Sequence, residues 1–573
     1  MRSSAVRTGP SEGSPQTAPT ALTRCADVVV EALVRAGVDV FIGVPGGAIS
    51  PVYDALVERD DVRVVHARHE TTAMFMAIGH ARMRPGSLPC VLTTSGPGVT
   101  NALTGVAAAF GEGVPVLVLG GEVPTSKFGR GALQEGTAEA IDVVGMMRSV
   151  TRVAQPMTLA MRAPFQIAAA ARAARSGRPG PVFLSLPLDV AVTPIPASYA
   201  LVEEPEPPRV PSAEAIERAA ELLARANRPL LLAGSGARGA ANELAALARH
   251  LGAPVITSPK AKGVVDEGAG LCLGVFGYGG HPSALEWLQA EPPDVVLAVG
   301  CGLNEVSTNS WSSLVAGTRA FVQIDLDPEQ FGRNYRTDLA LLGDARATLA
   351  ALATQLPGAP RPVRSYTVRR YEPEREEDDS VPLAPARALA VLQAAMPPDT
   401  VYTVDIGEHL LFAIHYLRVA APDGFITSVA LGSMGSGIGA AVGAKLARPE
   451  RPVVAICGDY GFQMYGMDLN TCVQERLGVV FFVMNDHRMR MVEAGIDRIY
   501  GRGLRMDGPV VDFAVAARAH GAHGALATSA EELRRALEGR APDVPLVVDV
   551  RIDPGAGFPV NARVAEISNF ASE

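Results

Sequence analysis

Two carboxylates towards the C-terminal end of the chain stand where a divalent metal could be held. Asp459 follows an apolar run that ends at Cys457, and Asp486 closes a second apolar run at 479–485. Both runs predict buried strands of a parallel sheet, and such sheets bind ligands at the carboxyl ends of their strands. Mg²⁺ suits this arrangement, because it takes few protein oxygens together with phosphate oxygens. Acids at strand ends are common in α/β proteins, but the whole strand–helix–strand unit favours a metal–diphosphate site.

Short apolar runs alternate with Ala-rich helical stretches along most of the sequence. Each run is apolar almost throughout and ends in Gly, Pro, Asp or Asn, which is typical of strands covered by helices on both faces. The predicted strands lie at 91–96, 115–121, 181–187, 229–236, 294–300, 321–327, 452–461 and 479–486, and one predicted helix spans 240–252. The fold class is therefore α/β, with doubly wound parallel sheets.

The length of 573 residues suggests about three domains. Stretches rich in Pro or charge, at 191–212 and 355–385, lack helical periodicity and are predicted to be linkers. The predicted domains are 21–190, 213–354 and 386–573. Residues 1–20 are rich in Ser, Thr, Pro and Gly, and a disordered tail is favoured there over a transit peptide.

The composition excludes several classes of partner. The formal net charge of −9 gives no basic footprint for nucleic acid. No run approaches the roughly 18 apolar residues that span a bilayer, so we expect no membrane contact. Six cysteines without a CxxC pair predict reduced, mostly buried thiols in a cytoplasmic protein. Small molecules and further copies of the chain are the partners that we expect.

Motifs at both ends of the chain carry a family resemblance. The N-terminal motifs are FIGVPGGAISPVYDAL (41–56), HARHETTAMFMAIGHAR (66–82) and TTSGPGVTNALTGVAAAF (93–110). The C-terminal motifs are VDIGEHLLFAIHY (404–416), LGSMGSGIGAAVGAKLARPERP (431–452) and GDYGFQMYGMDLNTCVQERLGVVFFVMND (458–486). Over about residues 22–555 the chain resembles thiamine-diphosphate-dependent enzymes of the acetohydroxyacid (acetolactate) synthase type. Their metal–diphosphate signature is GDG with a closing NN, at the spacing seen here.

The resemblance implies a pyrimidine-binding domain at 21–190, a central nucleotide-binding-like domain at 213–354 and a diphosphate-binding domain at 386–573. It assigns Glu70 as the catalytic carboxyl group. Such a group hydrogen-bonds the aminopyrimidine of the cofactor, whose amino group can then take the proton from C2 of the thiazolium. From its position alone, Glu70 would be read as an acid at a helix N-terminus.

The same resemblance nominates the other site residues. Gln134 is the second catalytic residue, and Mg²⁺ would be held by Asp459, Asp486 and the backbone carbonyl of Arg488. Met434 would lie beneath the cofactor, although by itself it would be read as core packing. The predicted cofactor-binding residues are Glu70, Gly407, Glu408, His409, Gly432, Met434, Gly458, Asp459, Tyr460, Gly461, Asp486 and Met491.

Several positions depart from the family pattern. Tyr460 replaces the usual Gly, and Asp486 replaces the usual Asn, which adds a negative charge to the site. The stretch GCGLNEVSTN (300–309) lacks the arginine that grips the carboxylate of the second keto acid, and Leu133 replaces an active-site aromatic residue. We therefore expect an altered choice of acceptor.

The predicted function is a carboligase that decarboxylates a 2-oxo acid such as pyruvate and adds the resulting carbanion/enamine to a carbonyl acceptor. A non-ligating 2-oxo-acid decarboxylase or a C–C lyase is the alternative. A catalytically silent homologue is the third reading, which the retained carboxylates oppose. Arg488 and Arg490 could bind an acidic substrate, or they could face solvent or the diphosphate.

Two further features stay open at this stage. FAD could occupy the central domain, but GSGARG (234–239) is a weak signal, since Gly-rich turns after strands are common. The family builds each active site across a subunit interface, because the two halves of the site belong to different domains. The resemblance therefore implies a homodimer or homotetramer.

Overall fold

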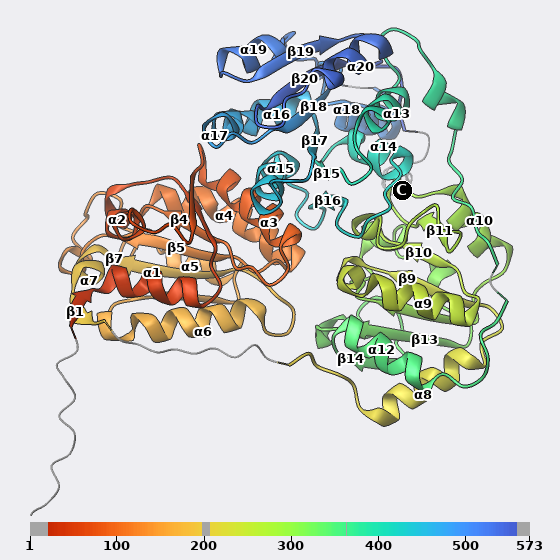
Figure 1. Cartoon of the computed structure of the whole chain (residues 1–573), viewed down its shortest axis with the longest axis horizontal. Helices are drawn as coiled ribbons and strands as arrows, with labels where there is room; N and C mark the ends of the chain where they lie inside the picture. Colours follow the sequence, from red (N-terminus) through yellow and green to blue (C-terminus); the bar gives the residue numbers. More distant parts are fainter. Residues whose placement is uncertain (1–20, 198–206, 363, 503, 559–573) are drawn as a thin grey trace, which may run out of the picture.

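The computed structural model describes residues 21–197, 207–362, 364–502 and 504–558. The predicted tail at 1–20 and much of the first predicted linker, 198–206, lie outside these residues. Three α/β units follow one another along the chain and appear in red to orange, yellow to green, and cyan to blue in Figure 1. Each contains a six-stranded parallel sheet flanked by helices, which confirms the predicted fold class. No helix of the described ranges is long and apolar enough to cross a bilayer.

The first unit positions Glu70 at the start of a helix. Its strands, in order across the sheet, are β3 (Arg63–His66), β2 (Val40–Gly43), β4 (Cys90–Thr93), β5 (Leu117–Glu122), β7 (Val182–Pro187) and β6 (Val153–Pro156). Its helices are α1 (Cys25–Arg35), α2 (Ser50–Leu56), α3 (Glu70–Met83), α4 (Pro97–Glu112), α5 (Val143–Arg148), α6 (Ala163–Arg175) and α7 (Leu188–Val192). The antiparallel pair β1 (Leu22–Arg24) and β8 (Pro194–Pro196) closes the unit. Strand β8 lies inside the stretch predicted as a linker, because Ile195 belongs to the core of this unit.

The central unit follows with its own sheet and core. The order across the sheet is β11 (Cys272–Val275), β10 (Val255–Thr257), β9 (Pro229–Ala233), β12 (Val295–Val299), β13 (Ala320–Asp325) and β14 (Leu339–Leu342). The helices are α8 (Ala213–Ala224), α9 (Ala241–Leu251), α10 (Pro282–Ala290), α11 (Glu305–Thr308) and α12 (Ala345–Gln355). The strand order reverses between β9 and β12. Open α/β sheets bind ligands at the carboxyl ends of the strands at such a point.

The C-terminal unit carries the two carboxylates. Its sheet has the order β16 (Phe425–Thr427), β15 (Val401–Val404), β17 (Val453–Gly458), β18 (Val479–Asn485), β20 (Leu546–Arg551) and β19 (His523–Ala527). Its helices are α13 (Pro385–Ala395), α14 (Glu408–Tyr416), α15 (Ser436–Ala447), α16 (Asp459–Tyr465), α17 (Leu469–Gln474), α18 (Arg490–Tyr500), α19 (Phe513–Ala519) and α20 (Ala530–Glu538). The single helix predicted between β17 and β18 is divided into α16 and α17 by a 3-10 turn at Gly466–Asp468.

Helices α3 and α15 join the first and the C-terminal units, and they lie side by side in Figure 1. Glycines allow their backbones to touch: a Cβ at Gly443 would overlap the carbonyl oxygen of Met76, and one at Gly79 would overlap that of Ala440. Both helices are buried along nearly their whole length. The pair is therefore a close-packed joint between units that are far apart in the sequence.

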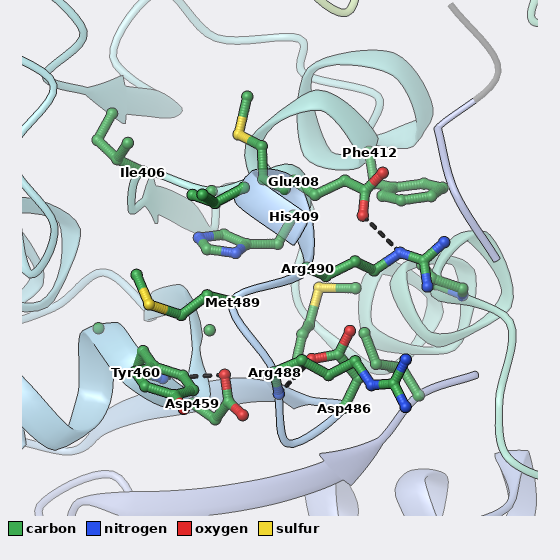
Figure 2. Close-up of a pocket in the computed structure, with 18 of the residues that line it drawn as sticks. Ile406, Glu408, His409, Phe412, Asp459, Tyr460, Asp486, Arg488, Met489 and Arg490 are labelled. Atoms are coloured by element: carbon green, nitrogen blue, oxygen red, sulfur yellow. Dashed lines mark hydrogen bonds and ion pairs between the residues drawn. The ribbon is translucent and has the colours of Figure 1, made fainter. Parts of the chain in front are cut away.

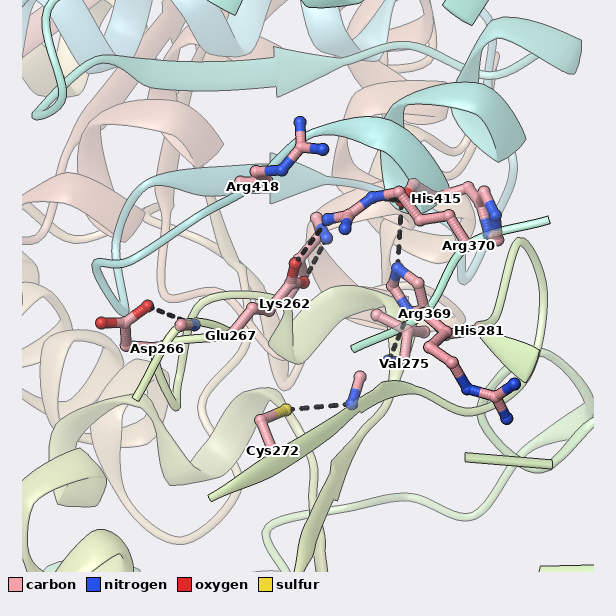
Figure 3. Close-up of polar contacts among 12 residues, drawn as sticks. Lys262, Asp266, Glu267, Cys272, Val275, His281, Arg369, Arg370, His415 and Arg418 are labelled. Carbon is pink, nitrogen blue, oxygen red and sulfur yellow. Dashed lines mark hydrogen bonds and ion pairs between the residues drawn. The ribbon is translucent and has the colours of Figure 1, made fainter. Parts of the chain in front are cut away.

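A buried polar cluster joins the central unit to the C-terminal unit (Figure 3). Glu267 forms ion pairs with the fully buried Lys262 and, at 3.3 Å, with Arg370. The rings of His281 and His415 stack with their centroids 4.9 Å apart, and His281 Nε2 lies 3.0 Å from the carbonyl oxygen of His415. Since Glu267 is flanked by two cations, these buried charges are paired rather than isolated.

Candidate active site

A pocket of about 160 Å³ lies at the carboxyl ends of β15, β17 and β18 (Figure 2). Most of the predicted cofactor residues line it: Gly407, Glu408, His409, Met434, Gly458, Asp459, Tyr460, Gly461, Asp486 and Met491, together with Arg488. Glu70, Gln134 and Gly432 are not among the lining residues. The pocket therefore gathers the diphosphate half of the predicted site and leaves out the pyrimidine half.

Asp459 and Asp486 occupy the ends of neighbouring parallel strands on the wall of this pocket. Asp459 begins α16, directly after β17, and Asp486 directly follows β18, which pairs with β17 along its length. Burial, and then the nearby carboxylate of Asp486, raises the pKa of Asp459 to about 7. Burial likewise raises the pKa of Asp486 to about 6. Two acids whose charged forms are disfavoured in this way are suited to a cation, which restores the charged forms.

The chemistry of these donors fits Mg²⁺ bound together with a phosphate. No group of three or more His, Cys, Asp or Glu side chains that could hold a metal occurs within the described ranges. The two carboxylates would therefore need backbone and phosphate oxygens to complete the coordination, which is what Mg²⁺ accepts. Tyr460, the departure from the family motif, points its hydroxyl to the carbonyl oxygen of Met506 at 3.3 Å. Its side chain thus ties the turn that begins with Asp459 to the loop before α19.

A buried polar atom on the pocket wall lacks a protein partner. His409 Nε2 has no hydrogen-bond partner in the part of the chain that the structure describes, although it is buried. Burial lowers the pKa of His409 to about 4, so the ring is neutral at physiological pH. A Cβ at Gly407 or Gly458 would crowd the His409 ring, so glycine at both positions leaves room for the ring. The orphaned nitrogen is a polar group that a bound ligand could satisfy.

The structure pairs two residues of this pocket that the sequence left unpaired. Glu408, in the first turn of α14, accepts a hydrogen bond of 2.8 Å from Arg490 Nε, at the start of α18. The other oxygen of the same carboxylate accepts the backbone N–H of Phe558 at 3.0 Å. Arg488 lies 3.5 Å from Asp507 and is more exposed. Arg490 is therefore neutralised by Glu408, and Arg488 is the freer cation at this site.

Asp405 is a residue of the site that the sequence analysis missed. It is fully buried at the end of β15 and accepts the backbone N–H groups of Gly435 at 2.7 Å and Gly437 at 3.1 Å. These bonds fix the turn that carries Met434, which lines the pocket, and bring it to the start of α15. The apolar run that ends in this acid could have indicated it, as the equivalent runs indicated Asp459 and Asp486.

The pyrimidine half of the predicted site lies in the first unit. Glu70 is buried at the N-terminus of α3, and its Oε2 accepts a hydrogen bond of 3.0 Å from Asn101 Nδ2, in α4. Gln134 is exposed and has a φ of 63°, and its backbone packs against the turn at Gly96. Both readings of Glu70 hold structurally, because the residue begins a helix and is also a buried carboxyl group with a polar partner.

Comparison with known proteins assigns a family to the units that carry these residues. Residues 23–143 match the N-terminal TPP (thiamine pyrophosphate) binding domain of thiamine pyrophosphate enzymes, residues 216–352 their central domain and residues 405–550 their C-terminal TPP binding domain. A probable acetolactate synthase large subunit of Methanocaldococcus jannaschii is 33% identical over 570 residues, 95% of this chain and 94% of the relative. The acetolactate synthase isozyme 2 large subunit of Escherichia coli K12 is 32% identical over 538 residues, 92% of this chain and 95% of the relative. The chain belongs to the thiamine pyrophosphate enzyme family.

Membership of this family, whose cofactor is also called thiamine diphosphate, confirms the predicted class of enzyme. The protein is a thiamine-diphosphate-dependent carboligase of the acetolactate synthase-like type. The matched N-terminal segment contains Glu70, and the matched C-terminal segment contains both pocket carboxylates.

The central domain of this family member contains a larger cavity. Its volume is about 440 Å³, and its lining includes the glycine turns after β9 and β12, where the strand order reverses. A Cβ at Gly234 would overlap the carbonyl oxygen of Gly300, so glycine lets the backbones of the two turns pack against each other. Asp325, at the end of β13, and the exposed Arg333 also line the cavity. This is the position at which open α/β sheets bind nucleotides.

One wall of the cavity is a junction of all three units of the enzyme. Glu112, at the end of α4, is paired with Lys260 of the central unit at 3.0 Å and with Arg82 of the first unit at 3.4 Å. Its other oxygen accepts the backbone N–H of Ala430, in the C-terminal unit, at 2.8 Å. Ala430 lies four residues before Met434, so this junction also supports the segment that leads to the pocket at the ends of β15, β17 and β18.

Proposed function

We propose that this carboligase decarboxylates pyruvate or a similar 2-oxo acid and couples the remaining fragment to a carbonyl acceptor. The pocket that holds Asp459, Asp486 and the orphaned His409 Nε2 carries the proposal, in a chain related over almost its whole length to acetolactate synthase large subunits. When bound, thiamine diphosphate supplies a thiazolium carbon that adds to the 2-oxo acid and accepts its electron pair as CO₂ leaves. The protein supplies position, charge and proton control.

The pocket residues divide these tasks. Asp459, Asp486 and the backbone carbonyl of Arg488 would hold Mg²⁺ against the diphosphate. His409 would face the diphosphate, whose negative charge favours the protonated ring that can donate from Nε2. Met434, fixed through Asp405, would support the rings from below.

Glu70 would hold a proton at the aminopyrimidine ring nitrogen, and Asn101 would orient its carboxyl group. Since Glu70 does not line the pocket of its own chain, each site would take this residue from a second copy. We therefore infer a homodimer or homotetramer with active sites at the subunit interface. Free, buried cysteines throughout fit the reducing cytoplasm in which we place the enzyme.

We infer that Arg488 would bind the carboxylate of an acidic acceptor. The segment 300–309 has no arginine and lies in the central unit, and Arg490 is occupied by Glu408. Within the described ranges, Arg488 lies 3.5 Å from Asp507 and 3.9 Å from Glu493, which is longer than the 2.8 Å pair of Arg490, and it lines the pocket. We also infer that the central cavity holds a nucleotide cofactor, for which FAD is the candidate that the family supplies.

Incubation with Mg²⁺, thiamine diphosphate, and a panel of 2-oxo acids with and without aldehyde or ketone acceptors tests the activity. Mass spectrometry should detect CO₂ loss together with a coupled hydroxyketone or acetohydroxy acid. Glu70→Gln should lower turnover by about 100-fold or more, the scale of a general acid–base contribution. Glu58→Gln, an exposed carboxylate of the same unit, is the matched control and should be unchanged. Free aldehyde as the sole product would replace the carboligase with a decarboxylase.

Co-expression tests the shared site. Glu70→Gln and Asp459→Ala should each be inactive alone, whereas a mixed dimer would contain one site with both native residues. Recovery of activity in the mixture supports sites built from two copies. Continued inactivity of a verified mixed dimer would show that each chain builds its own site.

A further inference from the structure

An unusual turn places a tryptophan on the wall of the central cavity. Asn309, Ser310 and Trp311 have φ values of 53°, 57° and 55°, so three consecutive residues other than glycine are left-handed. The left-handed conformation is strained for an L-residue that carries a Cβ. Asn309 needs no special explanation, because it caps the C-terminus of α11 and Asn is common there. Ser310 and Trp311 have no such reason.

Backbone hydrogen bonds hold the turn in this conformation. The N–H of Ser310 bonds to the carbonyl oxygen of Glu305 at 3.0 Å, and that of Trp311 bonds to Thr308 Oγ1 at 3.2 Å. The N–H of Ser312 bonds to the carbonyl oxygen of Thr308 at 3.0 Å. These bonds hold the turn in place. The turn presents the side chain of Trp311, which lines the cavity and is 47% exposed. Core packing does not require a large ring that is half-exposed.

The rest of the cavity indicates what such a ring would meet. The exposed Arg333 and the glycine turns suit phosphate, and Lys260 lines the same space while paired with Glu112. Asp325 ends β13, one strand beyond the glycine turn at Gly300, where dinucleotide-binding folds place the acid that takes the ribose hydroxyls. A nucleotide has both a phosphate and a ribose, and it also carries a planar heteroaromatic base or a flavin.

We infer that Trp311 is the flat wall against which the planar ring of a nucleotide in the central cavity stacks. The strained turn then has a function, because strain of this kind is typical of ligand clamps. The inference rests on the proposed nucleotide site and names one residue that determines its affinity. Stacking tolerates any base, so adenine nucleotides and flavin nucleotides are both suitable, and the test separates them.

Isothermal titration of the full chain, freed of any bound nucleotide, with FAD, FMN and ADP measures the contribution of Trp311. Trp311→Leu should weaken binding of whichever nucleotide binds by about 10-fold or more, and Trp311→Phe should restore part of the loss. Trp287→Phe is the matched control: Trp287 packs against Arg228 at 3.7 Å, is not in the cavity lining, and should leave the affinity unchanged. The chain has only these two tryptophans, so ADP should quench the emission of Trp311 and spare that of Trp287.

The outcomes separate this inference from the proposed function. Equal affinity in native protein and Trp311→Leu would overturn the stacking role and leave the nucleotide site intact. Absence of binding of FAD, FMN and ADP by folded native protein would overturn the stacking role and the nucleotide site together. Both results are independent of 2-oxo acid turnover, on which the carboligase proposal depends. Far-UV circular dichroism of the variants checks that they keep the native secondary structure.

Discussion

Glu408 and Arg490 form a 2.8 Å ion pair between the first turns of α14 and α18, and each side chain is only 17% exposed. None of the residues of α18 is buried, so this pair is a main attachment of the helix to the wall of the pocket. The two residues are far apart in the sequence. A change at either one would loosen the segment that follows the metal motif.

Loss of this pair should increase the mobility of α18. We expect Glu408→Gln and Arg490→Gln each to speed amide hydrogen exchange over 490–500 by about 5-fold, the scale of an ion-pair contribution of about 1 kcal/mol. The double variant should exchange no faster than either single variant. Additive effects in this cycle would show that the two side chains act separately.

The two pocket carboxylates should differ in their tolerance to substitution. Asp459→Ala should abolish Mg²⁺-dependent binding of thiamine diphosphate in calorimetry, because the metal loses a charged ligand. Asp486→Asn keeps an oxygen donor and should bind more weakly without losing the cofactor. Equal loss in both variants would contradict the assignment of Asp486 as a ligand through one oxygen.

The affinity of the metal-free protein for Mg²⁺ should depend on pH. Because the pKa of Asp459 is raised to about 7 and that of Asp486 to about 6, a proton competes with the metal below these values. Affinity should therefore rise between about pH 6 and pH 8. In Asp486→Asn the rise should shift to lower pH, since the carboxylate that helps to raise the pKa of Asp459 is gone. A flat profile in native protein would refute the coupling.

The stacked histidines at the junction of the units should make stability sensitive to acid. Burial lowers the pKa of His415 to about 4, and that of His281 is lowered as well. The unfolded chain binds protons from about pH 6.5 downward, whereas the folded chain does not, so stability falls as pH drops from about 6.5 to 4. His415 alone accounts for about 3 kcal/mol over this range.

Chemical denaturation at several pH values measures this effect. In the folded state, the N–H of Tyr371 bonds to His415 Nε2 at 2.8 Å, and Lys262 and Arg370 lie nearby, so an added proton has no acceptor there. His415→Gln should lower stability at neutral pH and flatten the acid limb. An unchanged slope in this variant would exclude His415 as its source.

The helix joint should not tolerate a methyl group. Gly443→Ala places a Cβ on the carbonyl oxygen of Met76 and should destabilise the protein by about 1–3 kcal/mol or prevent folding. Gly495→Ala is the control, because Gly495 lies in α18 with open space around it and alanine favours the helix. Thermal unfolding compares the two. Similar melting temperatures for the two variants would mean that α3 and α15 can separate at little cost.

The sequence predicted those parts of the site that follow from local pattern. Asp459 and Asp486 each end an apolar run, so strand prediction alone placed them at one sheet edge. The pairing of Glu408 with Arg490 was not predictable from the sequence. It depends on how α18, which follows β18, packs against α14, which follows β15. Glu112 illustrates the same limit, since its partners belong to three different units of the chain. The sequence pattern identifies which residues lie at strand ends, whereas their side-chain partners depend on tertiary packing.

The joint between α3 and α15 has a mechanical consequence for the proposed dimer. Glu70 begins α3, and Met434 lies two residues before α15, so one rigid body carries the acid for one site and the cofactor support for another. In the proposed dimer, a displacement of Met434 during turnover would be transmitted through this joint to the Glu70 that serves another site. Two identical sites linked in this way would not turn over independently, because ligand binding at one site would change the position of Glu70 in the other.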